Sequence, residues 1–113
     1  MRILEESKNM SPIVYVVQDP SGKNILPAQE YGDLQVVLKG NEESSRAQDK
    51  LMQMAEQFRA GYDCLLLIGH PVLIGLAMHF VLQATCGRID VLVWEPRRYK
   101  YSRKTINLDN EPS

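Results

Sequence analysis

A strand, helix, strand pattern between Tyr62 and Trp94 limits most strongly what this chain can fold into. It opens with a continuous apolar run, Cys64 to Ile68, breaks at Gly69-His70-Pro71, and continues for about four helical turns of almost unbroken apolar residues. After Gly87 a second β-rich run extends to Trp94. Parallel strands that are covered on both faces are apolar throughout, because neither side meets water. The pattern therefore predicts a βαβ unit.

The flanking segments predict the remaining elements. β-branched runs and apolar alternation indicate further strands, and a capping-box pattern from Ser45 to Gln48 opens an amphipathic helix that ends at Gly61. We predict an α/β fold with a small, mostly parallel, Rossmann-like sheet, two main helices and a C-terminal β-hairpin. Strands are expected near 13–18, 34–38, 63–68, 89–95 and 99–108, and helices near 45–60 and 71–86.

The length and charge of the chain narrow its class. With 113 residues it can build one hydrophobic core but not two. We expect residues 1–10 to form a flexible leader, 11–108 a single α/β domain and 109–113 a polar tail. A formal net charge of -1 excludes a protein that coats nucleic acid by bulk charge alone, so any such binding needs a local patch.

The apolar segments predict neither secretion nor a membrane partner. No apolar signal segment opens the chain, and the longest apolar stretch is shorter than the roughly 20 residues that cross a bilayer. The two cysteines, Cys64 and Cys86, have neither disulfide-scaffold nor zinc-site spacing, and we expect both to be buried. The expectation is a cytoplasmic protein without a metal or another cofactor.

The first candidate site is the junction Gly69-His70-Pro71. Ligands of open parallel sheets bind at the carboxyl ends of the strands, where the next helix begins. His70 occupies the expected N-cap position and Pro71 suits the first helical position. His70 could bind an anion or a nucleotide, act as a general acid or base, or only cap the helix. The spacing of Gly69 and Gly75 does not match a P-loop, and Gly75 is better explained by close packing of the helix on a strand.

The second candidate site is the basic aromatic segment 94–104. Lys and Arg can neutralise phosphates while Trp and Tyr offer stacking faces, a combination that suits single-stranded nucleic acid. A protein-binding edge and a merely solvated hairpin are the alternatives, because edge strands often carry Lys and Arg. The candidate nucleic-acid-binding residues are Trp94, Arg97, Arg98, Tyr99, Lys100, Tyr101, Arg103 and Lys104.

Two further patterns concern oligomerisation and catalysis. The helix predicted at 71–86 is apolar on nearly every face, and so short a chain has little material to cover it. We therefore expect a homodimer.

No catalytic motif is present: there is no nucleophile elbow, no paired histidine ligands and no cysteine with an evident base partner. Catalytic residues are accordingly not assigned, and a non-enzymatic role is favoured.

Three stretches resemble a family of short uncharacterised proteins encoded in tailed-bacteriophage genomes: VYVVQDPSGKNILPAQEYGDLQVVL, YDCLLLIGHPVLIGLA and GRIDVLVWEPRRYKY. The resemblance covers most of residues 12–108. Family members have a Gly-Asp-Pro motif before the apolar helix, and this chain has His70 in place of its Asp. They also have a Trp-Asp-Arg motif in the hairpin, and this chain has Glu95 in place of that Asp. The first departure argues against one fixed side chain performing chemistry at that position. The resemblance implies a phage origin and action in the cytoplasm of an infected bacterium, but no reaction.

Three functions from different classes follow. The leading one is a small phage-type accessory protein that is not an enzyme and binds nucleic acid, or a nucleoprotein complex, through the basic aromatic hairpin. The second is a protein–protein module that modifies a host enzyme. The third is a nucleotide-binding or nucleotide-processing domain with its ligand at Gly69, His70 and Pro71.

Overall fold

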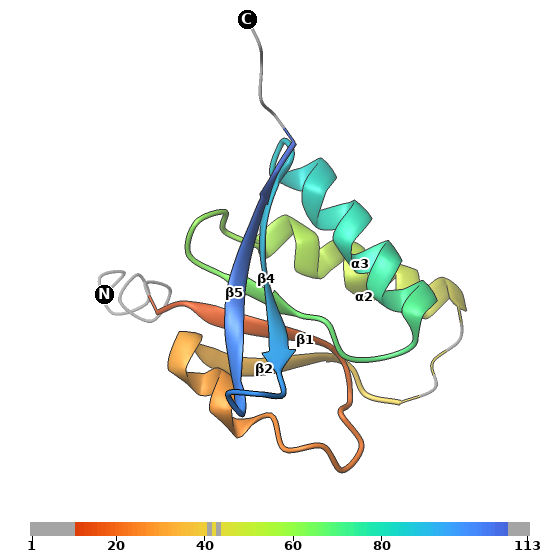
Figure 1. Cartoon of the computed structure of the whole chain (residues 1–113). Helices are drawn as coiled ribbons and strands as arrows, with labels where there is room; N and C mark the ends of the chain where they lie inside the picture. The colour runs from red at the N-terminus through yellow and green to blue at the C-terminus, as the bar shows by residue number, and fades with distance from the viewer. Residues whose placement is uncertain (1–10, 41, 43, 109–113) are drawn as a thin grey trace, which may run out of the picture.

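The computed structural model describes residues 11–40, 42 and 44–108 (Figure 1). The leader predicted at residues 1–10 and the polar tail predicted at 109–113 lie outside the described residues. A five-stranded sheet in the order β2-β1-β3-β4-β5 organises the described chain. Its strands are β1 (Ile13–Gln18), β2 (Asp33–Leu38), β3 (Cys64–Leu66), β4 (Arg88–Glu95) and β5 (Lys100–Asn107).

Three of the four strand pairings are parallel. β1 lies between β2 and β3 and is parallel to both, β4 is parallel to β3, and only β5 is antiparallel to its neighbour β4. The prediction of a mostly parallel Rossmann-like sheet with a C-terminal hairpin is confirmed. In this order the chain moves from β1 to one side of the sheet and then returns to the other side, so a topological switch point lies between β1 and β3.

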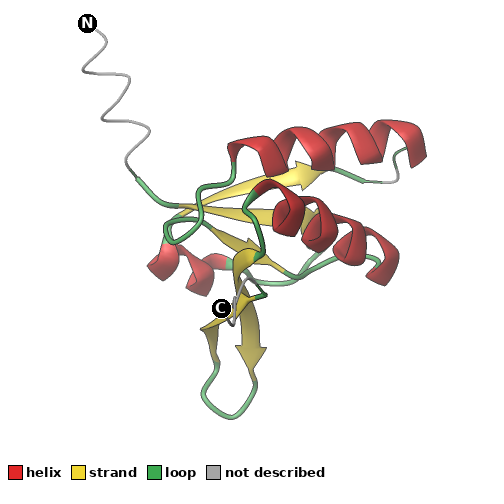
Figure 2. Cartoon of the chain, turned by 90° about the horizontal axis from the view of Figure 1, so that it is seen from above, coloured by secondary structure: helices red, strands yellow, loops and turns green. Residues whose placement is uncertain are grey.

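Helices cover both faces of the sheet (Figure 2). On one face α2 (Ser44–Gln57) and α3 (Pro71–Ala84) contribute Leu51, Met54 and Val81 to a core with Tyr15, Leu65 and Ile89 of the strands. On the other face a 3-10 helix, η1 (Leu26–Tyr31), places Ala28 in a smaller core. Strand residues that are adjacent in sequence therefore enter different cores, which explains why the strands are apolar without alternation.

The ends of three elements differ from the sequence-based expectations. α2 ends at Gln57 instead of near residue 60. β3 ends at Leu66 instead of residue 68, because a tight turn bonds the Ile68 N–H to the Leu66 carbonyl at 2.9 Å. α3 ends at Ala84, where Cys86 and Gly87 take positive φ and the Gly87 N–H bonds to the Leu82 carbonyl at 2.8 Å.

This helix end also corrects one expectation about the cysteines. Cys64 is buried as predicted, but Cys86 is exposed, because the left-handed turn carries it away from the core.

The expectation of close packing at Gly75 is also wrong, since a Cβ atom added there would meet no atom within 4 Å. Gly75 lies on the outer side of α3 and has no steric reason to be glycine.

Candidate functional site

The junction between β3 and α3 forms a complete helix cap. The His70 Nδ1 atom accepts the N–H of Val72 at 3.1 Å, and the His70 carbonyl accepts the N–H groups of Leu73 and Ile74. The His70 N–H itself donates to the Gln18 Oε1 atom at 2.8 Å. His70 is therefore the N-cap of α3, as one of the sequence-based alternatives predicted. An anion that used the His70 or Val72 N–H group would have to displace one of these internal bonds.

Gln18, which the sequence analysis did not single out, connects three segments at the carboxyl edge of the sheet. Its Oε1 atom binds the His70 N–H and its Nε2 atom donates to the Gly40 carbonyl at 3.2 Å, so it joins the ends of β1, β2 and β3. Gly69 makes room for it. The φ angle of Gly69 is 137°, and an added Cβ atom would lie 2.7 Å from the Gln18 Cβ atom.

Two adjoining hollows open at this carboxyl edge. The first has a volume of about 480 Å³ and lies at the switch point between β1 and β3, where open α/β sheets bind ligands. The second has a volume of about 530 Å³ and extends to the β4–β5 hairpin. Lys23 and Ile68 line both. The first is also lined by Gln18, Asp19, Pro20, Ser21, Gly40 and Gly69, and the second by Asn24, Pro27, Trp94 and Tyr101.

The loop after β1 forms the outer wall of both hollows, and its shape follows from its sequence. The Asp19 carboxylate accepts the Ser21 N–H at 3.0 Å, and Ser21 and Gly22 both have positive φ. Further along, the Asn24 Oδ1 atom accepts the Leu26 N–H at 3.1 Å and so starts η1. These short-range bonds hold Lys23 between the hollows. The turn residues Asp19 to Gly22 by themselves predict only a turn, and the signal that could have singled them out is their position directly after a parallel strand.

The hairpin divides its aromatic and basic side chains between the two faces of the sheet. Trp94 and Tyr101 lie opposite each other in the β4–β5 register, on the face that η1 covers. Glu95, Ser102 and Lys104 lie on the other face, because successive strand residues alternate. Tyr99 follows the turn with a φ of 52° and packs edge-on against Trp94. The interleaving of aromatic and basic residues that the sequence predicted is therefore limited to the end of the hairpin.

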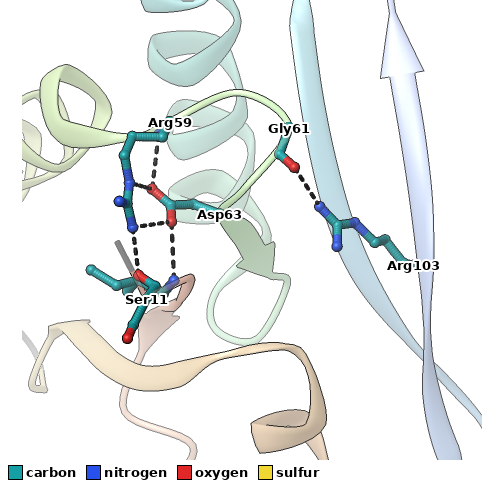
Figure 3. Close-up of polar contacts among 6 residues, drawn as sticks. Ser11, Arg59, Gly61, Asp63 and Arg103 are labelled. Carbon is teal, nitrogen blue, oxygen red and sulfur yellow. Dashed lines mark hydrogen bonds and ion pairs between the residues drawn. The ribbon is translucent and has the colours of Figure 1, made fainter. Parts of the chain in front are cut away.

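Two of the five hairpin cations are neutralised within the protein. Arg103 binds the buried Asp90 carboxylate at 2.6 Å. It also donates to the Gly61 carbonyl at 3.3 Å (Figure 3). The hydrogen bond to Asp90 raises the pKa of the Arg103 guanidinium. Lys104 lies 3.7 Å from Glu95, whose pKa is lowered by the Ser102 hydroxyl and then by the nearby cations. Both residues thus have internal partners.

The other three cations remain available. Arg97, Arg98 and Lys100 are exposed around the turn, and none forms an ion pair with a carboxylate of the described chain. The structure therefore gathers three unpaired cations and the aromatic residues Trp94 and Tyr99 at the end of the hairpin. Arg103 and Lys104 are not part of this group.

Two further properties of the described residues concern metal binding and membrane insertion. Within residues 11–40, 42 and 44–108, no three His, Cys, Asp or Glu side chains are grouped so that they could hold a metal ion. None of the helices in that part of the chain has the length and apolar character needed to cross a membrane.

Comparison with known proteins places the chain in a family. No curated protein and no solved structure matches it. A family model described as Phage Pam3 gp32-like protein matches residues 12–108, which include every strand and helix of the structure. This match confirms the resemblance to short phage-encoded proteins. The chain belongs to the Phage Pam3 gp32-like protein family.

Proposed function

We propose that this phage-family protein is a non-enzymatic accessory protein that binds single-stranded nucleic acid, free or within a nucleoprotein complex, through the end of the β4–β5 hairpin. The observation that carries the proposal is the grouping of exposed aromatic rings with unpaired cations at that end. Trp94 and Tyr99 remain 40% and 79% exposed. Aromatic side chains of this size are normally buried, and exposed ones indicate a binding surface.

The aromatic residues form a connected cluster. The Trp94 ring centroid lies 5.0 Å from that of Tyr101 and 6.5 Å from that of Tyr99, with interplanar angles of 67° and 72°. Tyr101 is buried and anchors Trp94 to the sheet, whereas Tyr99 is exposed. Stacking of a base on such a side chain contributes about 1–3 kcal/mol and tolerates any sequence, because every base has a π face.

The cations supply the contact to phosphates. Arg97 and Arg98 lie in the turn before Tyr99, and Lys100 follows it on the face opposite Trp94. None of the three has an ion pair within the described chain. They give the hairpin a local positive charge, although the whole protein has a net charge of -1. Each phosphate that they neutralise releases counterions, so binding should weaken as salt rises.

The test is fluorescence anisotropy with a labelled single-stranded oligonucleotide over a series of salt concentrations. The double variant Arg97→Ala/Arg98→Ala should bind more weakly and lower the slope of log affinity against log salt by about 1.4, because each phosphate contact on a single strand contributes about 0.7. The matched control is Lys39→Ala/Arg46→Ala, which removes two exposed cations elsewhere. Parent-like binding by the hairpin variant, or equal weakening by the control, contradicts the proposal.

A protein–protein role is the second candidate, and the surface of α3 favours it. Val72 is 61% exposed, and Leu76 and Phe80 are only partly buried. An apolar helix surface of this kind suits a second copy of the chain or a host protein. A complex with a host enzyme that survives nuclease treatment and is lost in Val72→Lys would support this role over nucleic-acid binding.

A further inference from the structure

The second hollow is a pocket of the size and composition that small ligands use. Its volume of about 530 Å³ falls within the roughly 300–1,000 Å³ of known ligand pockets. Four separate segments form its wall: the loop after β1, the start of η1, the turn after β3 and the hairpin. Such a pocket combines apolar surface with a few polar groups, as specific ligand sites do.

The apolar wall is held rigidly. Tyr101 is 5% exposed, and its backbone carbonyl accepts the Tyr31 hydroxyl at 3.0 Å, which fixes β5 to the end of η1. Trp94 packs edge-on against the Tyr101 ring. Because the two ring planes are 67° apart, a flat ring can stack on one of them and meet the other with its edge. Rings that are already fixed in this way need little further ordering on binding.

The polar groups lie on the opposite side of the pocket. Lys23 is exposed, forms no ion pair in the described chain and lines both hollows. The Asn24 Oδ1 atom is bonded to the Leu26 N–H, so its amide nitrogen is available as a donor. The first hollow adds the side chains of Gln18, Asp19 and Ser21.

We infer that the second hollow binds the base of a nucleoside phosphate against Trp94 and Tyr101, and that Lys23 binds its phosphate group. A ligand without a flat ring would leave the aromatic wall unused, and a ligand without an anion would leave Lys23 without a partner. The sugar would lie toward the first hollow, where the Asp19 carboxylate can accept hydrogen bonds from hydroxyl groups. Because carboxylates repel phosphates, the phosphate belongs at Lys23 rather than beside Asp19.

This inference deepens the proposed function, and it rests on that function where the ligand is part of a nucleic-acid strand. The nucleoside phosphate can be a free nucleotide or the terminal nucleotide of the strand that the hairpin binds. Both sources share the same chemistry, and oligonucleotides with different ends distinguish them. A 5′-phosphorylated strand should bind more tightly than the same strand with a 5′-hydroxyl or a 3′-phosphate if the pocket holds a 5′ end.

The fluorescence of Trp94 reports ligand binding in the pocket directly, because Trp94 is the only tryptophan in the chain. Titration with the four common nucleoside monophosphates should quench its fluorescence in a saturable way. Ribose 5-phosphate, which lacks the base, and adenosine, which lacks the phosphate, should each bind more weakly. Absence of saturable quenching by every nucleotide overturns the inference. Equal binding of ribose 5-phosphate and the nucleotides overturns the assignment of the aromatic wall to a base.

Two variants separate the parts of the pocket. Lys23→Gln should weaken nucleotide binding about fivefold, which is the contribution of one exposed ion pair, and should leave adenosine binding unchanged. Arg46→Gln, which removes one cation from the exposed side of α2, is the matched control and should have no effect. Trp94→Leu, followed by calorimetry because it removes the fluorophore, should weaken nucleotides and adenosine alike. Parent-like nucleotide affinity in Lys23→Gln overturns the role of that residue.

The hairpin variants distinguish a failure of this inference from a failure of the proposed function. Arg97→Ala/Arg98→Ala should retain the parent affinity for mononucleotides while losing affinity for oligonucleotides. If oligonucleotides bind and mononucleotides do not, the pocket assignment fails and the proposed function stands. If mononucleotides bind and oligonucleotides gain nothing from their additional phosphates, the pocket assignment stands and the proposed function fails.

Discussion

Arg59 and Asp63 form a two-point ion pair that closes the segment between α2 and β3. The guanidinium Nη2 atom lies 2.9 Å from Asp63 Oδ1, and the Nε atom lies 3.2 Å from Oδ2 (Figure 3). Asp63 is fully buried and also accepts the backbone N–H groups of Ile13 and Arg59. Arg59 in turn donates to the Ser11 carbonyl at 2.6 Å. The pair thus fastens the beginning of β1 to the chain that enters β3.

The first prediction concerns the stability that this pair provides. Asp63→Asn should lower the free energy of unfolding by about 2–4 kcal/mol, because it leaves buried N–H donors and a partly buried guanidinium without their anionic acceptor. Urea unfolding followed by circular dichroism measures the change. Asp49→Asn, at an exposed position of α2, is the control and should alter stability by less than about 0.5 kcal/mol. A small effect at Asp63 would mean that solvent replaces the lost acceptor.

The second prediction compares three glycines. Gly69→Ala should destabilise the protein by about 2 kcal/mol or more, since its positive φ and the clash with the Gln18 Cβ atom act together. Gly22→Ala should cost about 1 kcal/mol, because Gly22 has positive φ but no neighbour within 4 Å. Gly75→Ala should stabilise by about 0.5–1 kcal/mol, because alanine favours the helix and nothing obstructs its Cβ atom. Thermal unfolding of the three variants gives the order of their stabilities directly.

The third prediction concerns the two thiols and alkaline pH. Burial raises the pKa of the Cys64 thiol from 9.0 to about 11. In the unfolded chain the thiol ionises at the lower value, so stability should be unaffected below pH 9 and should fall as the pH rises from 9 toward 11. Unfolding measured at half-unit pH steps up to 9.5 tests this, because tyrosines of the unfolded chain, with an ordinary pKa of 10.0, are still mostly protonated there. At neutral pH, a thiol reagent should label Cys86 quickly and Cys64 only after unfolding.

Removing each cysteine in turn provides the control for this pH dependence. Cys64→Ala should flatten the decline in stability above pH 9, whereas Cys86→Ala should keep it. If both variants decline as steeply as the parent, another group is responsible for the alkaline transition.

The fourth prediction tests the expected homodimer. We expect α3 to form the contact, because Val72 is 61% exposed and its neighbours Leu76 and Phe80 are only partly buried. In sedimentation velocity the protein should run as a dimer, and Val72→Lys should run as a monomer. Leu26→Lys changes an equally exposed apolar residue in η1, on the other face of the sheet, and should leave the dimer intact. A parent protein that is monomeric at all concentrations contradicts the expectation.

Much of the fold could be predicted from local patterns. The apolar runs of β1, β3 and β4 identified the buried parallel strands, because only strands that are covered on both faces lack polar alternation. His70 and Pro71 marked the start of α3, because the N-cap bond to Val72 depends on residues two positions apart. The end of α3 could not be placed as well, because Cys86 takes a left-handed conformation that its residue type does not favour.

The sequence alone determined the strands, the two main helices and the presence of a basic aromatic hairpin, and it offered the cap at His70 as one of several alternatives. These features depend on side chains within a few residues of one another. Only the tertiary structure decided that Arg103 is neutralised by Asp90, that Gln18 joins three strand ends, and that Lys23 lies beside Trp94 across a shared pocket. Such relationships depend on strand order and on the face to which each side chain points. Residues far apart in the chain then become neighbours, and no local pattern records their distance.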